Sequence, residues 1–242
     1  MPRFNLDLSK PVLCLALDER SLEGNLRLAE QVANGVDMLK INDDSVDEAG
    51  LMACVEPFRQ FHLPFWIDMK MLKGSGTMTE RAKSAAALGA SFINAYALAD
   101  RLLRGPVAAL EGTETGLLGL TVLTHYDDEY CRKFFKRSLA DTVRLLAKTA
   151  VEFGCHGIIL PPTPLSVVAD IDTIKVTPGI RPDWSERKAN DQESSATPTE
   201  AVLGGSKILV VGSPARNHPD GPAVGARRIK EEMEEAWASL TR

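Results

Sequence analysis

The sequence predicts an α/β fold, a closed (β/α)8 (TIM) barrel, and three observations support this prediction. Short apolar runs of strand length alternate with longer amphipathic stretches along the 242 residues. Eight such runs are present, whereas an open doubly wound sheet, the alternative, more often has about five or six strands. No GxGxxG turn follows the first run, which disfavours a dinucleotide-binding sheet. The length suits one barrel, so we expect a single domain over residues 1–242.

The elements follow one another in strict alternation, which implies parallel strands joined by crossover helices. The expected strands are Val12–Leu17, Met38–Ile41, Phe65–Met69, Ser91–Ala95, Leu117–Leu123, Gly157–Leu160, Ile174–Val176 and Ile208–Val211. Helical patterns include Leu22–Asn34, Thr79–Leu88, Ser138–Phe153 and Ala223–Leu240. Thr79 is expected to cap the second of these, ahead of an acidic first turn. Gly89 and Gly154 each follow a helical pattern and precede a strand, where a left-handed C-cap favours glycine.

Composition excludes several classes of protein. The net charge of −5 disfavours a nucleic-acid partner, because such a surface usually carries a basic surplus. No 18 apolar residues run together and the start does not resemble a signal peptide, so we expect a cytoplasmic protein with no membrane span. The four cysteines lie far apart without a CxxC pair, so no metal site is expected from them.

Charged residues stand at the carboxyl ends of the first three expected strands, where this fold places its chemistry. The first strand ends in Asp18, the second in Lys40, and the third carries Asp68 and Lys70, with Lys73 just beyond. Residues two apart in a strand share a face, so Asp68 and Lys70 should both point toward the barrel mouth. Any one of these charges could belong to a surface ion pair. Together they favour a mutually paired cluster that can repel a substrate anion and donate a proton.

Glycines mark the ends of the last two expected strands, in Pro178-Gly179 and in Gly212-Ser213. Backbone N–H groups can approach an oxyanion closely there, and the loops after strands seven and eight form the usual phosphate site of this fold. The long polar segment Arg181–Ser195 follows the seventh strand and is expected to be a functional loop. The sequence therefore predicts a site for a phosphorylated small molecule.

These residues resemble the orotidine 5′-monophosphate decarboxylase superfamily over nearly the whole chain. Asp18 and Lys40 match its strand-one aspartate and strand-two lysine, and its Asp-x-Lys-x-x-Asp motif aligns with the segment from Asp68 to Lys73. The matching runs later in the chain are Thr177–Pro182 for Thr-Pro-Gly-Ile-Arg-Pro, Asp191-Gln192 for an Asp-Gln pair of the phosphate loop, and Val210–Pro214 for Val-Val-Gly-Arg-Pro.

The departures from the family pattern fall on functional positions. Lys73 replaces an aspartate that a partner subunit contributes across a dimer interface, although Thr77 remains. Ser213 replaces the phosphate-binding arginine, and Arg216 either reaches the phosphate instead or belongs to a solvated turn. A lysine at position 73 should attract a substrate carboxylate in the ground state, which slows decarboxylation or marks a different substrate.

The resemblance implies a cofactor-independent lyase of pyrimidine biosynthesis, a homodimer that converts orotidine 5′-monophosphate to uridine 5′-monophosphate. Lys70 would protonate C6, Asp68 would stress the substrate carboxylate, and Lys40 with Asp18 would anchor ribose hydroxyls. The implied substrate-binding residues are Thr77, Thr124, Pro178, Gly179, Gln192, Gly212, Ser213 and Arg216. The alternatives are a divergent member that acts on another nucleotide or sugar phosphate, and a non-catalytic nucleotide-binding barrel.

Overall fold

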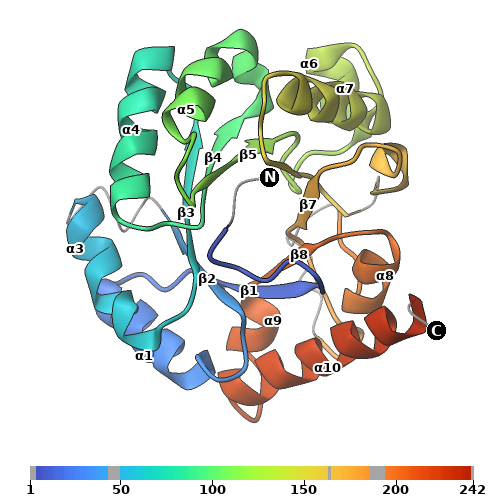
Figure 1. The fold of residues 1–242 in the computed structure, drawn as a ribbon. Helices are drawn as coiled ribbons and strands as arrows, with labels where there is room; N and C mark the ends of the chain where they lie inside the picture. The colour runs from blue at the N-terminus through green and yellow to red at the C-terminus, as the bar shows by residue number, and fades with distance from the viewer. Residues whose placement is uncertain (1–3, 43–49, 163–164, 186–193, 241–242) are drawn as a thin grey trace.

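The computed structural model describes residues 4–42, 50–162, 165–185 and 194–240, and it forms a closed parallel barrel (Figure 1). The strands are β1 Val12–Leu17, β2 Met38–Asn42, β3 Phe65–Met71, β4 Phe92–Tyr96, β5 Gly116–Leu120, β6 Gly157–Ile159, β7 Ile174–Thr177 and β8 Ile208–Val211. Each strand pairs in parallel with the next, and β8 closes the barrel against β1, for example through Ile208 and Val12. The predicted (β/α)8 barrel is confirmed.

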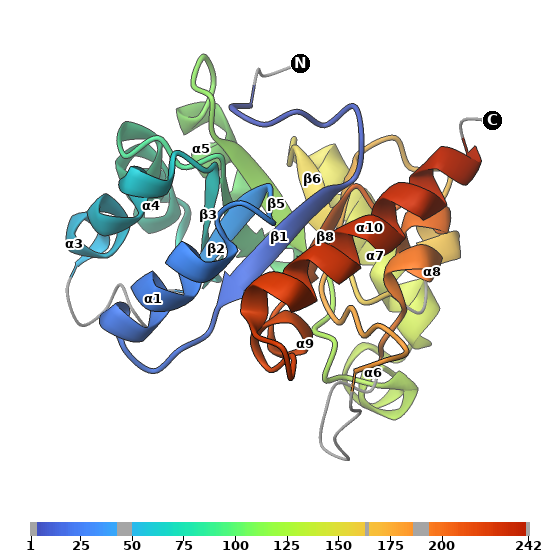
Figure 2. The same cartoon turned by 90° about the horizontal axis from the view of Figure 1, so that it is seen from below.

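Helices surround the barrel on all sides (Figure 1). The α-helices are α1 Leu22–Val32, α3 Leu51–Val55, α4 Ser75–Ala87, α5 Arg104–Ala109, α6 Asp128–Phe135, α7 Leu139–Glu152, α8 Pro198–Leu203, α9 Ser213–Arg216 and α10 Pro222–Leu240. The 3-10 helices of the described residues are η1 Glu56–Phe61, η2 Ala97–Leu103 and η3 Leu165–Val168. Figure 2 shows α6 and α9 at one end of the barrel, and the first described residues of the chain at the other. No helix in the described ranges has the length and apolar character needed to span a membrane.

Several element boundaries differ from those expected. The fifth strand ends at Leu120 and not at Leu123, because the chain leaves the ladder there to line a cavity. Helix α4 begins at Ser75, one turn before the expected start, with Gly74 as its N-cap. The prediction that Thr79 caps this helix is wrong, since its hydroxyl donates to the Ser75 carbonyl inside the helix. Gly89 and Gly154 adopt the predicted left-handed conformation, with φ of 74° and 84°.

Strand alternation decides which side chains reach the barrel interior. Ala16, Met38, Trp66 and Val210 belong to an apolar cluster that fills the inside of the barrel. The residues two positions after them in their strands or at the strand ends are Asp18, Lys40, Asp68 and Gly212. These four positions therefore lie above the apolar interior, at the carboxyl end of the barrel.

Candidate functional site

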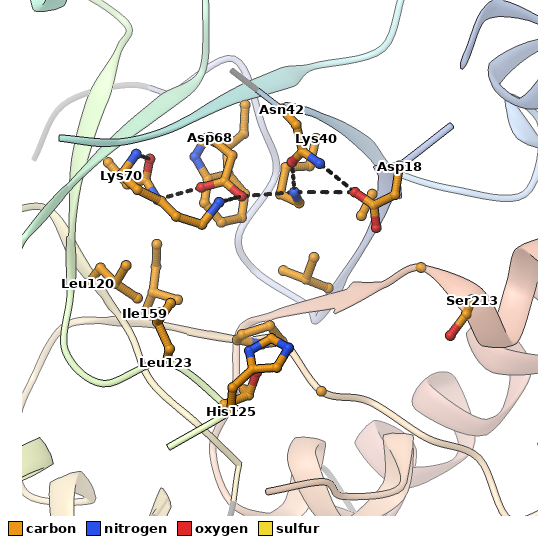
Figure 3. Close-up of a pocket in the computed structure, with 18 of the residues that line it drawn as sticks. Asp18, Lys40, Asn42, Asp68, Lys70, Leu120, Leu123, His125, Ile159 and Ser213 are labelled. Atoms are coloured by element: carbon orange, nitrogen blue, oxygen red, sulfur yellow. Dashed lines mark hydrogen bonds and ion pairs between the residues drawn. The ribbon is translucent and has the colours of Figure 1, made fainter. Parts of the chain in front are cut away.

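Four charged side chains form a row at the barrel mouth, in the order Lys70, Asp68, Lys40, Asp18 (Figure 3). Asp68 Oδ2 accepts from the Nζ atoms of Lys40 and Lys70, each at 2.8 Å. Nζ of Lys40 also lies 3.8 Å from Asp18 Oδ1. The side chains of Lys40 and Asp68 are 9% and 6% exposed, whereas those of Lys70 and Asp18 are about 40% exposed. The structure therefore brings these four predicted residues together, with the inner pair buried and the outer pair facing solvent.

Mutual pairing keeps the buried members of the row ionised. Burial lowers the pKa of Lys40, but the carboxylates of Asp68 and Asp18 outweigh this effect and hold the pKa above its ordinary value. Burial likewise raises the pKa of Asp68, yet Lys40 and Lys70 bring that pKa below its ordinary value. Lys40 and Asp68 therefore form a charged pair at neutral pH.

Two asparagines, which the sequence analysis did not identify, extend the hydrogen bonds of the row. Asn42 Oδ1 accepts from Nζ of Lys40, and Asn42 Nδ2 donates to Asp18 Oδ1 at 2.6 Å. Asn94 Nδ2 donates to the Oδ1 atom of Asp68 at 2.8 Å. Asparagine side chains are neutral, so a search for charged residues does not find them. Their position near the carboxyl ends of neighbouring strands is the sequence feature that could have identified them.

The backbone of β3 is irregular at the site. Lys70 has a φ of 41°, which is unusual for a residue other than glycine, and the β3–β4 register shifts between Ile67 and Met71. The expectation that Asp68 and Lys70 share a face rested on regular strand geometry, which ends here. Their side chains meet all the same, because the irregular backbone at Lys70 still allows its ammonium to reach Asp68.

A cavity of about 410 Å³ opens against the charged row. Leu120, Leu123 and Ile159 form an apolar wall across the cavity from the row (Figure 3). Trp66 lies beneath, with its ring centroid 5.9 Å from Nζ of Lys40. A bound molecule would therefore meet charges on one face and hydrocarbon on the other.

The ends of β7 and β8 form a further part of the cavity wall, beyond the charged row and the apolar wall. Gly179, with a φ of 85°, lines it together with Pro178. Gly212 also lines it, and a Cβ there would lie 3.0 Å from Asp18 Oδ2, so a larger residue would require the Asp18 carboxylate to shift. Ser213 follows as the first residue of α9 and also lines the cavity (Figure 3).

Two arginines line the cavity on this side. The sequence left two roles open for Arg216, a contact with the phosphate or a place in a solvated turn. The residue lines the cavity, and its Nη1 donates to the Asp18 carbonyl oxygen at 3.2 Å. Its Nε lies 3.5 Å from Glu19 Oε1. Arg181 is buried and lines the cavity as well, with Nη1 donating to the Ile180 carbonyl. Arg181 was missed as a site residue, although it stands within the Thr177–Pro182 run that carried the resemblance.

The other predicted residues fall in three places. Thr124 is buried and lines the cavity, where its carbonyl accepts from Ser194 N at 3.3 Å. Lys73 and Thr77 are exposed and lie outside the cavity, and Lys73 makes no ion pair with the part of the chain that the structure describes. Gln192 lies outside the described residues. Across residues 4–42, 50–162, 165–185 and 194–240, no group of three His, Cys, Asp or Glu side chains could hold a metal ion.

Comparison with known proteins gives consistent matches. The model of the orotidine 5′-phosphate decarboxylase / HUMPS family matches residues 11–229. Proteins named orotidine 5′-phosphate decarboxylase from Methylobacterium sp. (strain 4-46) and Methylorubrum extorquens (strain PA1) are 32% and 33% identical to the chain, and each match covers 93% of the chain and 96% of the relative. A crystal structure of orotidine 5′-phosphate decarboxylase from Lactobacillus acidophilus is similar with a TM-score of 0.77 at 26% identity, covering 93% of this chain and 99% of that chain.

Proposed function

Because the chain belongs to the orotidine 5′-phosphate decarboxylase / HUMPS family, we propose that it converts orotidine 5′-monophosphate to uridine 5′-monophosphate in pyrimidine biosynthesis. The observation that carries this proposal is the row of Lys70, Asp68, Lys40 and Asp18 beside the cavity. The proposal assigns every chemical step to side chains of the protein, as expected of a cofactor-independent carbon–carbon lyase.

The reaction needs a proton donor beside the scissile bond. When the bond between C6 and the carboxyl carbon breaks, carbon dioxide leaves and the electron pair stays on C6. Lys70 Nζ then donates a proton to C6 and regains one from solvent, to which its half-exposed side chain has access. Asp68 places a negative charge beside the substrate carboxylate, and loss of carbon dioxide relieves that repulsion.

The rest of the cavity suits the remaining parts of a nucleotide. Asp18 and Lys40 anchor ribose hydroxyls, and Thr124 contacts the base. The phosphate lies at the ends of β7 and β8, where backbone N–H groups and two guanidinium groups favour an anion. The residues assigned to phosphate binding are Pro178, Gly179, Arg181, Gln192, Gly212, Ser213 and Arg216.

Lys73 and Thr77 reach a substrate only if a second subunit presents them, so the proposal includes a homodimer. Both residues are exposed and lie outside the cavity of their own chain. Leu72, directly before Lys73, is 51% exposed, and Leu98 after β4 is 53% exposed. Apolar side chains exposed on two neighbouring segments support a protein contact there.

A second candidate function is supported by two substitutions. Lys73 and Ser213 reverse or remove charges that the family pattern places around the substrate, and both changes suit a different nucleotide or a sugar phosphate. The paired row Asp18–Lys40–Asp68–Lys70 is present, which favours either enzyme over a non-catalytic nucleotide-binding barrel.

The test combines turnover with binding. Purified protein is incubated with orotidine 5′-monophosphate while the loss of orotate absorbance is followed, and uridine 5′-monophosphate binding is measured by calorimetry. The proposal predicts turnover that Lys70→Ala abolishes and that Lys83→Ala, at an exposed lysine paired with Glu80, preserves. Nucleotide binding without turnover points to altered chemistry or to a binding barrel. If the protein neither turns over orotidine 5′-monophosphate nor binds uridine 5′-monophosphate, sugar phosphates should be tested as substrates.

A further inference from the structure

Asn94 occupies a special place in the site although it does not carry a charge. The residue is 1% exposed on β4, and both ends of its carboxamide are used. Nδ2 donates to Asp68 Oδ1 at 2.8 Å, and Oδ1 accepts from the backbone N–H of Lys70 at 3.0 Å. One side chain thus connects the carboxylate and the main chain of the two residues that the proposed reaction places nearest the scissile bond.

The contact with Asp68 fixes the orientation of its carboxylate. Oδ2 is shared by the ammonium groups of Lys40 and Lys70, and Oδ1 is bound by Asn94. Each oxygen therefore has its own partners, and rotation of the carboxylate would break at least one of these bonds. A buried group with every bond made is held rigidly, and a misplacement of about 1 Å at a reacting group can cost about 100-fold in rate.

The contact with Lys70 compensates for an interruption in the sheet. Between Ile67 and Met71 the β3–β4 register shifts, and Lys70 adopts a φ of 41°. A partly buried backbone N–H at such a bulge needs a partner other than the regular ladder. The Asn94 carboxamide provides it, and in doing so fixes the point from which the Lys70 side chain leaves the backbone.

We propose that Asn94 is a positioning residue, which holds Asp68 and Lys70 in the relative geometry required for proton delivery. This inference rests on the proposed function for its kinetic consequences. Its structural consequences depend only on the two hydrogen bonds of Asn94. The two can therefore be tested separately.

Kinetics of Asn94→Leu test the first consequence. The near-isosteric leucine keeps most of the volume and removes both hydrogen bonds, so kcat should fall about 10- to 100-fold. KM should change less than about threefold, because Asn94 contacts none of the groups assigned to phosphate binding. Thr115→Val is the matched control, since Thr115 directly precedes β5 and its hydroxyl makes a buried hydrogen bond to the Ala90 carbonyl, which the substitution removes. A fall in kcat of less than threefold, or an equal fall in Thr115→Val, would overturn the inference.

Asn94→Asp provides a readout that a merely structural role would not change. At low pH the new carboxyl group is protonated and can donate to Asp68 Oδ1 in place of the amide. As pH rises and the proton is lost, two carboxylates face each other, with Lys40, Lys70 and Asp18 as the other charged neighbours. The kcat of Asn94→Asp relative to wild type should therefore fall as pH rises. A pH-independent ratio would contradict the role of the donated hydrogen bond.

A crystal structure of Asn94→Leu tests the geometry without any turnover. We expect the separation of Asp68 Oδ2 and Lys70 Nζ to grow from 2.8 Å to beyond about 4 Å, the limit of an ion pair. An unchanged separation would overturn the inference even in an active enzyme. If wild-type protein does not turn over orotidine 5′-monophosphate, the proposed function fails, and this structure alone decides whether Asn94 positions the pair.

Discussion

Lys40 and Asp68 form an ion pair of 2.8 Å in a place where each side chain is less than one-tenth exposed. Bringing two charges out of water is costly, and their attraction offsets that cost only when the pairing is close and further hydrogen bonds are made. Here Asn42 and Asn94 complete the bonds of the lysine and the aspartate. Removal of either partner would leave the other charge buried without its ion-pair partner, which lowers the free energy of unfolding.

Lys40→Met should lower the free energy of unfolding by about 3 kcal/mol, because it leaves Asp68 buried with Lys70 as its remaining ammonium partner. Urea unfolding followed by circular dichroism measures this. Lys83→Met is the control, since its pair with Glu80 is exposed and should contribute less than about 1 kcal/mol. Equal effects of the two substitutions would show that burial of the Lys40–Asp68 pair has no energetic consequence.

His156 predicts a pH dependence of stability. Its Nδ1 accepts from the Leu117 backbone N–H at 3.0 Å, and burial lowers the pKa of the imidazole. Protons then bind the unfolded chain first, so its contribution to stability is full above about pH 6.5 and is lost as pH falls toward the folded-state pKa. His156→Asn, which can still accept a hydrogen bond, should flatten the unfolding free energy between pH 7 and 5. An unchanged slope in His156→Asn would show that His156 is not the source of this pH dependence.

Lys73→Asp should separate ground-state from transition-state effects. In the proposed dimer, Lys73 attracts the substrate carboxylate before carbon dioxide leaves, so its replacement should raise KM and raise kcat, each several-fold. Steady-state kinetics with orotidine 5′-monophosphate measure both constants, and Thr77 is kept as wild type. If the wild type is inactive and Lys73→Asp is highly active, the changed-substrate alternative is wrong.

The closed barrel and most of the charged row could be predicted from the sequence, because periodicity and strand-end positions carry that information. Val12–Leu17 and Ile208–Val211 have the expected bounds. Asn94 could not be identified, since its role arises from a register shift that no local pattern indicates. Arg181 could have been identified, because it is the cationic residue of a recognised run in which Pro178 and Gly179 were already assigned to the site. The role proposed for Lys73 belongs to a homodimer, whose second subunit a single chain does not contain.

We propose that this site removes carbon dioxide from orotidine 5′-monophosphate with Lys70 as the proton donor. The most direct measurement is release of labelled carbon dioxide from substrate labelled in its carboxylate, with wild type and Lys70→Ala compared at saturating substrate. We expect steady release by wild type and a loss of at least about 100-fold in the variant, because the variant lacks the proton donor. Absence of release by wild type, or equal release by the two proteins, would contradict it.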